Sequence, residues 1–138
     1  MKKSKNKYVI RGLVVAVILC ITAIFIYPKG RVERFVSKNK ESVEHSIENG
    51  LGLSIEGSWQ YFKTWEGEHS MSEFIICSWG ETYYGCYYSP DDVPLPFHNG
   101  PEELIPDGED SWTWLTQNGK TGKTSKLTDK WYYFETEF

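Results

Sequence analysis

The chain has 138 residues, a formal net charge of −4 and a mean hydropathy of −0.47. All 19 acidic residues lie after residue 12, where they face only 10 of the 15 basic residues. Because phosphate binding needs a concentrated positive face, this distribution argues against nucleic acid as a partner of the main part of the chain.

A run of 20 residues, 8–27, is uncharged but for one arginine and follows a lysine-rich segment, 1–7. As a helix it spans about 30 Å, the thickness of the hydrocarbon core of a bilayer. Tyr8 and Tyr27 lie where interfacial aromatic side chains are expected, and Pro28 ends the helix. The sequence therefore predicts a membrane protein with one transmembrane helix, 8–27, after a basic cytoplasmic tail, 1–7.

A cleaved signal peptide would occupy the same position, but no pair of small residues of the A-x-A type follows the apolar core. We therefore expect an uncleaved, single-pass signal anchor. Five basic residues lie toward each end of it, counting Arg11 near its start, so the charge count alone does not set its orientation. A short lysine tail is hard to translocate, whereas a whole domain crosses largely regardless of charge, which predicts an extracytoplasmic C-terminal domain at the cell membrane.

Residues 29–50 are predicted to form an amphipathic juxtamembrane helix that stops at Asn49-Gly50. One narrow apolar stripe runs along it, made of Val32, Phe35, Val36, Val43 and Ile47. The stripe has three candidate partners: its own domain, a second copy of the chain, or the membrane surface. Its own domain is favoured, because a short amphipathic helix needs such packing to be stable.

From residue 51 onward the pattern changes, and 18 of 88 residues are aromatic. Alternation with a period of two predicts a mainly β domain, 51–138, in which five or six antiparallel strands form a small sheet, barrel or sandwich. The expected strands are residues 59–65, 73–79, 82–88, 111–117 and 127–138, with a short sixth at Leu104-Ile105. The connection 89–110 is too long to be inert in a compact domain, so we expect its own apolar residues to order it.

Cys77 and Cys86 flank the predicted hairpin between the second and third strands. A turn centred on Glu81-Thr82 would place them opposite each other, close enough for a disulfide, which an external compartment permits. The alternative is a pair of buried free thiols, with the register shifted around Gly80-Glu81.

The aromatic residues are the feature of the sequence that bears most directly on function. Trp112 and Trp114 on one strand, with Trp131 and Tyr133 on another, are candidates for a platform that stacks on sugars or peptides. The competing interpretation is that such rings form the core of a domain with few leucine, isoleucine and valine residues.

Neither a metal nor a cofactor is expected. The segment 119–124 resembles a phosphate-binding loop but lacks the first glycine of that motif, so we expect a polar hairpin loop. The spacing of histidines and cysteines matches no zinc pattern, and the acids Asp91 and Asp92 lack the register of a calcium loop.

These patterns favour a membrane-anchored binding or assembly module at the cell surface. Its expected partners are the lipid bilayer and a protein or glycan, and no catalysis is expected. One alternative is a small cell-envelope hydrolase that uses loop carboxylates and His98. Another is a structural subunit of a membrane complex, which would assemble through the stripe at Val32, Phe35 and Val36.

Overall fold

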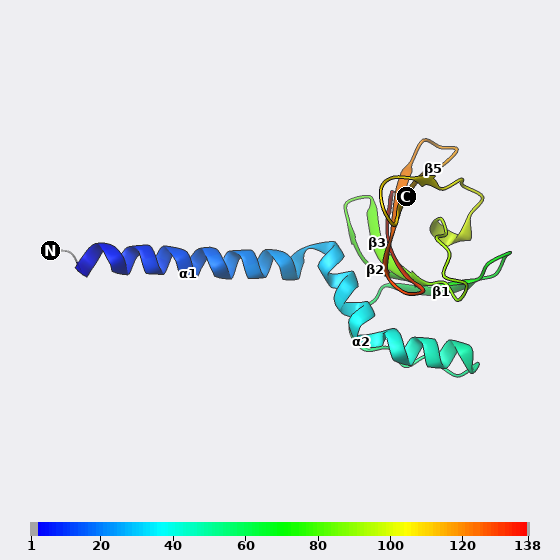
Figure 1. The fold of residues 1–138 in the computed structure, drawn as a ribbon, viewed down its shortest axis with the longest axis horizontal. Coiled ribbons are helices and arrows are strands. Elements are labelled where there is room, and N and C mark those ends of the chain that lie inside the picture. The colour runs from blue at the N-terminus through cyan, green and yellow to red at the C-terminus, as the bar shows by residue number, and fades with distance from the viewer. Residues whose placement is uncertain (1–2, 138) are drawn as a thin grey trace.

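A computed structural model describes residues 3–137, with side chains described for residues 8–23 and 27–137. Two helices, α1 (Lys3–Ile26) and α2 (Pro28–Glu48), precede one antiparallel sheet of seven strands, and α1 projects away from the rest of the chain (Figure 1). The C-terminal part is mainly β, as predicted. It forms a single sheet, with seven strands rather than five or six.

The two helices meet at Tyr27, where the backbone is extended (φ −60°, ψ 128°). Pro28 opens the first turn of α2, where a missing N–H is tolerated, and it thereby ends α1 close to the predicted position. No single helix in the described part of the chain is long and apolar enough to cross a membrane. Residues 8–23 and α2 reach that length and composition only as a pair, which is bent by 67°.

The strands lie in the order β1-β2-β3-β7-β6-β5-β4, and each neighbouring pair is antiparallel. Their bounds are β1 (Tyr61–Trp65), β2 (Met71–Trp79), β3 (Thr82–Tyr88), β4 (Ile105–Pro106), β5 (Ser111–Leu115), β6 (Thr121–Thr128) and β7 (Trp131–Glu137). Strand β7 pairs on both sides, with β3 and β6, so it lies inside the sheet as expected.

Strand β6 is the main departure from the predicted elements. The sequence predicts a polar loop over 119–124 and one long last strand from Leu127, but most of that loop belongs to β6, and a turn at Asp129-Lys130 separates β6 from β7. Asn118-Gly119 closes the β5–β6 hairpin, as the turn signal indicates. The segment after it is rich in threonine, whose branched side chain suits a strand even where the sequence is polar. Phe138, which the predicted last strand includes, lies outside the described residues.

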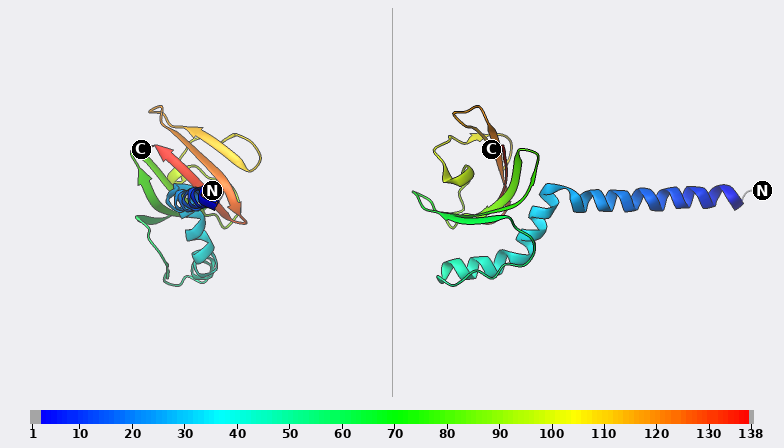
Figure 2. Two further views of the ribbon diagram at one scale, coloured as in Figure 1. Left: turned by 90° about the vertical axis from the view of Figure 1, so that its left-hand side faces the viewer. Right: turned by 180° about the vertical axis from the view of Figure 1, so that it is seen from behind.

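Helix α2 covers one face of the sheet, and the long connection between β3 and β4 covers the other (Figures 1 and 2). Under α2 the apolar side chains of the helix meet aromatic rings of the central strands: Val32, Phe35, Val36 and Val43 pack with Phe74, Ile76, Cys86, Tyr88, Trp131 and Tyr133. The prediction that the stripe packs on its own domain is confirmed.

On the opposite face, the connection contributes its own apolar side chains to a second core. Val93, Leu95, Phe97 and Leu104 pack there with Met71, Ile75, Tyr87, Trp114, Tyr132 and Phe134. The buried hydroxyl of Tyr87 accepts a bond from the Leu95 amide (2.8 Å) and bonds the Thr124 hydroxyl (2.9 Å). The connection is therefore ordered by packing, as expected, and is also tied to the sheet by a polar contact within the core.

Candidate functional site

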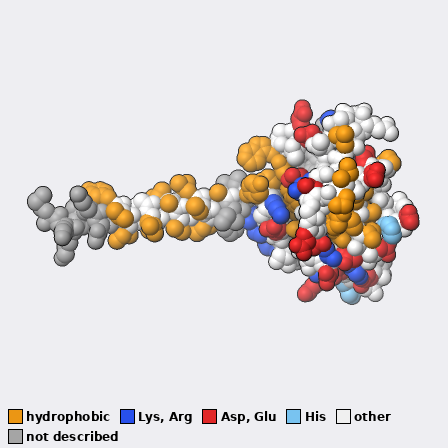
Figure 3. Space-filling view, turned by 45° about the horizontal axis from the view of Figure 1, so that its top comes forward, with side chains coloured by type: hydrophobic (Ala, Val, Ile, Leu, Met, Phe, Trp, Pro, Cys, Tyr) orange, Lys and Arg blue, Asp and Glu red, His pale blue; other side chains and the backbone are white. Residues whose placement is uncertain are grey.

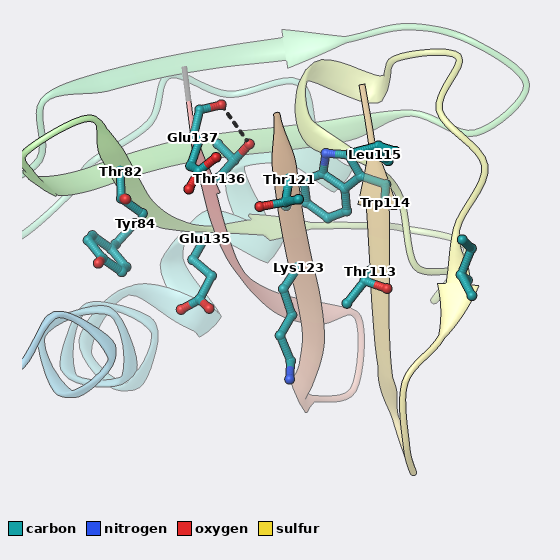
Figure 4. A pocket seen from close by; sticks show the side chains of 12 residues that line it. Thr82, Tyr84, Thr113, Trp114, Leu115, Thr121, Lys123, Glu135, Thr136 and Glu137 are labelled. Carbon is teal, nitrogen blue, oxygen red and sulfur yellow. Dashed lines mark hydrogen bonds between the residues drawn. The ribbon is translucent and has the colours of Figure 1, made fainter. Parts of the chain in front are cut away.

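The face of the sheet that bears α2 is only partly covered, because α2 packs on β2, β3 and β7. Across the strands on that face, one cross-strand row runs from Tyr84 to Glu135, Lys123, Thr113 and Ile105. Directly paired residues point to the same side of a sheet, so these side chains line one surface. Figure 4 shows the first four of them side by side.

This open surface forms a groove with a volume of about 600 Å³, which we call the sheet groove. Its lining also includes Thr82, Trp114, Leu115, Thr121, Gly122, Thr136 and Glu137. The rim carries the exposed apolar side chains of Ile105 and Leu115. A side chain at Gly122 would overlap the indole of its paired residue Trp114, so the glycine makes room for that ring in the core of the opposite face.

The polar groups of the sheet groove are partly held by neighbours. Lys123 Nζ lies 3.3 Å from Asp107 Oδ2, and the Tyr133 hydroxyl donates to Glu135 Oε2 at 2.8 Å. The described lining residues include hydroxyls, carboxylates and one ammonium group but neither histidine nor cysteine. This arrangement is suited to hydrogen bonding and apolar contact with a ligand rather than to nucleophilic chemistry.

A second concave site lies on the other face, where a buried carboxylate holds His98. Glu73 is fully buried, and its two oxygens accept bonds from His98 Nδ1 (2.8 Å) and from the His98 amide (2.9 Å). The imidazole lies between the rings of Trp65 and Phe97, with centroids at 4.5 and 3.6 Å. Both His98 and Asn99 have positive φ angles (57° and 52°), a strained backbone that the surrounding contacts hold in place.

Beside His98 is a cavity of about 360 Å³ lined by Gln60, Tyr61, Ile75, Tyr83, Phe97 and His98. A carboxylate that fixes an imidazole through Nδ1 is an arrangement found in general bases, and it also anchors a loop. The sequence prediction missed Glu73. The signal that indicates it is its position next to Phe74, Ile75 and Ile76, as the one charged residue of its strand.

Asp91 and Asp92, two acids of the long connection, bond groups other than His98. Asp91 lies 2.9 Å from the ring of a different histidine, His69. Asp92 accepts bonds from Lys126 Nζ (2.6 Å), the amide of Lys130 (2.8 Å) and the hydroxyl of Tyr132 (3.1 Å), and it ties the long connection to the β6–β7 hairpin. The bond from Lys126 is the main reason that the pKa of Asp92 lies below its usual value. In the alternative interpretation loop carboxylates act with His98, whereas the carboxylate that bonds His98 here is Glu73 of strand β2.

The predicted platform of four rings is also wrong. Trp131 and Tyr133 are buried beneath α2, and the indole Nε1 of Trp131 donates to Glu44 Oε1 at 2.8 Å. Trp112 and Trp114 belong to the core on the opposite face, and of the four only Trp114 lines the sheet groove. Both faces of the central strands are covered, so rings that alternation places outside are in fact in the core.

The predicted opposition of Cys77 and Cys86 is not found. Cys77 pairs with Tyr84 and Cys86 with Phe74, because a bulge at Ile76 shifts the register and the turn is at Gly80-Glu81. Both are buried free cysteines, as in the alternative interpretation. Burial raises the pKa of both thiols, most strongly that of Cys86, which makes them poor nucleophiles.

Among the described residues, no group of three or more histidine, cysteine, aspartate and glutamate side chains is placed to bind a metal. Comparison with protein-family models, with curated proteins and with solved structures finds no match to the chain.

Proposed function

We propose that the chain is a single-pass membrane-anchored protein whose β-domain acts as a binding or assembly module at the cell surface. The observation that carries the proposal is the exposure of the apolar side chains of α1. Each side chain from Tyr8 to Ala23 is exposed, although the segment is almost entirely apolar. Figure 3 shows the hydrophobic side chains running along the whole described length of the projecting helix.

Leaving the apolar side chains of α1 in water has a large cost in free energy. The exposed large apolar side chains of this helix are Tyr8, Val9, Ile10, Leu13, Val14, Val15, Val17, Ile18, Leu19 and Ile21. Removing one such aliphatic side chain from water is worth about 1.5–3 kcal/mol, so a bilayer that covered all of them would be strongly favoured over water. An isolated apolar helix of this size left in water would associate nonspecifically.

The groove supports the binding part of the proposal. The sheet groove is open, partly apolar and rich in hydroxyl groups, and a protein or glycan partner at the cell surface would offer complementary groups. A membrane tether lowers the intrinsic affinity that such binding needs, because partners in or near the same membrane meet at high effective concentration. Assembly through the α2 stripe is less favoured, since that stripe is covered by the sheet.

Two measurements test the anchor and its orientation. We expect the protein to stay in the membrane pellet after alkaline carbonate extraction, and Val14→Lys/Ile18→Lys to release it. In a Cys20→Ser background, a membrane-impermeant maleimide added to intact cells should label Gln117→Cys in the exposed β5–β6 turn. Extraction of the unaltered protein would refute the anchor, and labelling from the cytoplasmic side alone would reverse the orientation.

A pull-down from membranes tests the groove. Leu115→Asp with Lys123→Glu changes one exposed apolar side chain of the rim and the charge beside it, and should abolish partner capture. Leu51→Asp is the matched control, because Leu51 is an exposed leucine (54 %, against 61 % for Leu115) that does not line the groove. Equal capture by both variants would remove the groove from the proposal.

A second candidate function is a small cell-envelope hydrolase with His98 as general base, and the Glu73–His98 bond is the observation that favours it. The test is the release of soluble fragments from purified cell-wall material by the reconstituted protein. Hydrolysis that disappears in His98→Gln, with unchanged circular dichroism, would favour the enzyme. Absence of release by the native protein would end this candidate.

A further inference from the structure

Trp79 is the most exposed large apolar side chain among residues 51–137, with 67 % of its surface open to solvent. It is the last residue of β2, and the turn that follows contains Gly80 with a positive φ (62°) and the exposed Glu81. A tryptophan at the tip of a hairpin has no packing role to explain it, since the cores on both faces of the sheet are built without it.

The location of the β2–β3 turn, which follows Trp79, indicates what this side chain could contact. Figure 1 and the right panel of Figure 2 show the β2–β3 turn on the side of the β-domain from which α1 leaves, above the junction of α1 and α2 and at a similar position along the α1 axis. Two residues before Trp79, the thiol of Cys77 is close enough to Arg31 of α2 for that charge to act on its pKa. The other end of β2, at the β1–β2 turn, faces away from α1.

The first turns of α2 bring positive charge to the same side. Figure 3 shows Lys and Arg side chains gathered where the β-domain meets α1. Lys29, Arg31 and Arg34 lie on these turns, and Lys29 Nζ is 5.5 Å above the ring of Tyr133, which fixes it to the sheet. Tyr27, at the helix junction, is 64 % exposed.

We propose that Tyr27, Lys29, Arg31, Arg34 and Trp79 form a membrane-proximal face, by which the β-domain rests on the bilayer that holds α1. The proposal depends on the proposed anchor. Tryptophan and tyrosine rings favour the headgroup region because one end is apolar and the other polar, and lysine and arginine attract anionic lipid headgroups. Three exposed acids on this side, Glu33, Glu81 and Glu137, keep the tip at headgroup level rather than in the hydrocarbon.

The consequence is a fixed orientation. A single helix with a break at Tyr27 would otherwise allow the domain to swing, whereas a second contact at Trp79 holds the sheet at one angle to the membrane. The sheet groove, which includes Thr82 and Glu137 near the same tip, would then open close to the membrane surface. A ligand presented at the headgroup level would reach it directly.

Spin-label accessibility in reconstituted vesicles tests this face in the full chain. In a Cys20→Ser background, a nitroxide is attached at Glu81→Cys, next to the retained Trp79, or at Glu68→Cys in the β1–β2 turn. Both positions are exposed glutamates at opposite ends of β2, so they are matched in charge and in exposure class. The vesicles contain phosphatidylcholine alone or with phosphatidylserine, and the probes are oxygen and a water-soluble nickel chelate.

We expect the label at 81, but not at 68, to be protected severalfold from the nickel chelate, and Trp79→Gln to remove that protection. Phosphatidylserine should increase the protection, and Lys29→Gln/Arg31→Gln should cancel the increase. Equal accessibility at 81 and 68 in both vesicles, with α1 still resistant to extraction, would overturn the docked face and leave the anchor intact. Protection that depends on protein density rather than on Trp79 would mean that a second copy covers the face, which also overturns the proposal.

Discussion

Two histidines of this chain bond a carboxylate through Nδ1 at almost equal distances, and they differ mainly in burial. His98 lies 2.8 Å from Glu73, whose side chain is fully buried, whereas His69 lies 2.9 Å from Asp91, whose side chain is 54 % exposed. A surface pair of this kind contributes about 0–1 kcal/mol to stability, because water and salt screen it. Removing one partner of a buried pair costs about 3–5 kcal/mol, because the remaining group is left without compensation.

We therefore expect His98→Ala to lower the free energy of unfolding by about 3 kcal/mol, near the lower end of that range because the His98 amide still donates to Glu73. His69→Ala should cost less than about 1 kcal/mol. Urea unfolding in detergent micelles, followed by tryptophan fluorescence, measures both. Alanine also tolerates a positive φ poorly, so His98→Gly separates the lost bond from backbone strain. Equal losses at the two histidines would refute the view that burial sets the magnitude.

Three further predictions concern stability in the same assay. The pKa of Asp92 is lowered mainly by its bond to Lys126. The ionised carboxylate therefore stabilises the fold above the usual pKa of 3.8, and this contribution is lost as the pH falls from there through the lowered pKa. Asp92→Asn should be less stable than the native chain at neutral pH, with a difference that shrinks in acid. Gly85→Ala should cost about 1–3 kcal/mol, because its methyl group would overlap the backbone carbonyl of Phe74 in β2 and the ring of Phe134 in β7, whereas Gly52→Ala, in open space, should cost much less. Tyr87→Phe should cost about 1–3 kcal/mol, because it leaves a buried amide and a buried hydroxyl without their shared partner, and a loss below the error of the assay would contradict that role.

Local signals determined much of the outline. The apolar run and Pro28 indicated two helices with a break between them, and the stripe on the second helix indicated the face that packs. Alternation placed most of the strands, and Asn118-Gly119 placed the β5–β6 turn. These features depend on residues that are close in sequence, where periodicity and turn chemistry act directly.

The candidate sites could not be obtained in this way. Glu73 and His98 are 25 residues apart, and nothing local to either predicts that one is buried and the other bent back onto it. The turn at Gly80-Glu81 pairs Cys77 with Tyr84, two residues from Cys86, and the bulge at Ile76 then moves the partner of Cys86 one residue further, to Phe74. The sheet groove exists only because five strands that are distant in sequence, β3, β7, β6, β5 and β4, lie side by side.

The sequence by itself determined the kind of elements, their order and the long apolar helix at the N-terminal end, because these follow from composition and from periods of two and 3.6 residues. Only the tertiary structure decided which aromatic rings are core and which are surface. The predicted platform rings Trp131 and Tyr133 were buried because α2 returns to cover them, while Trp79, given no role by its pattern, was left exposed next to the β2–β3 turn. Alternation states that two faces differ, but the partner that covers each face is set by contacts between distant parts of the chain.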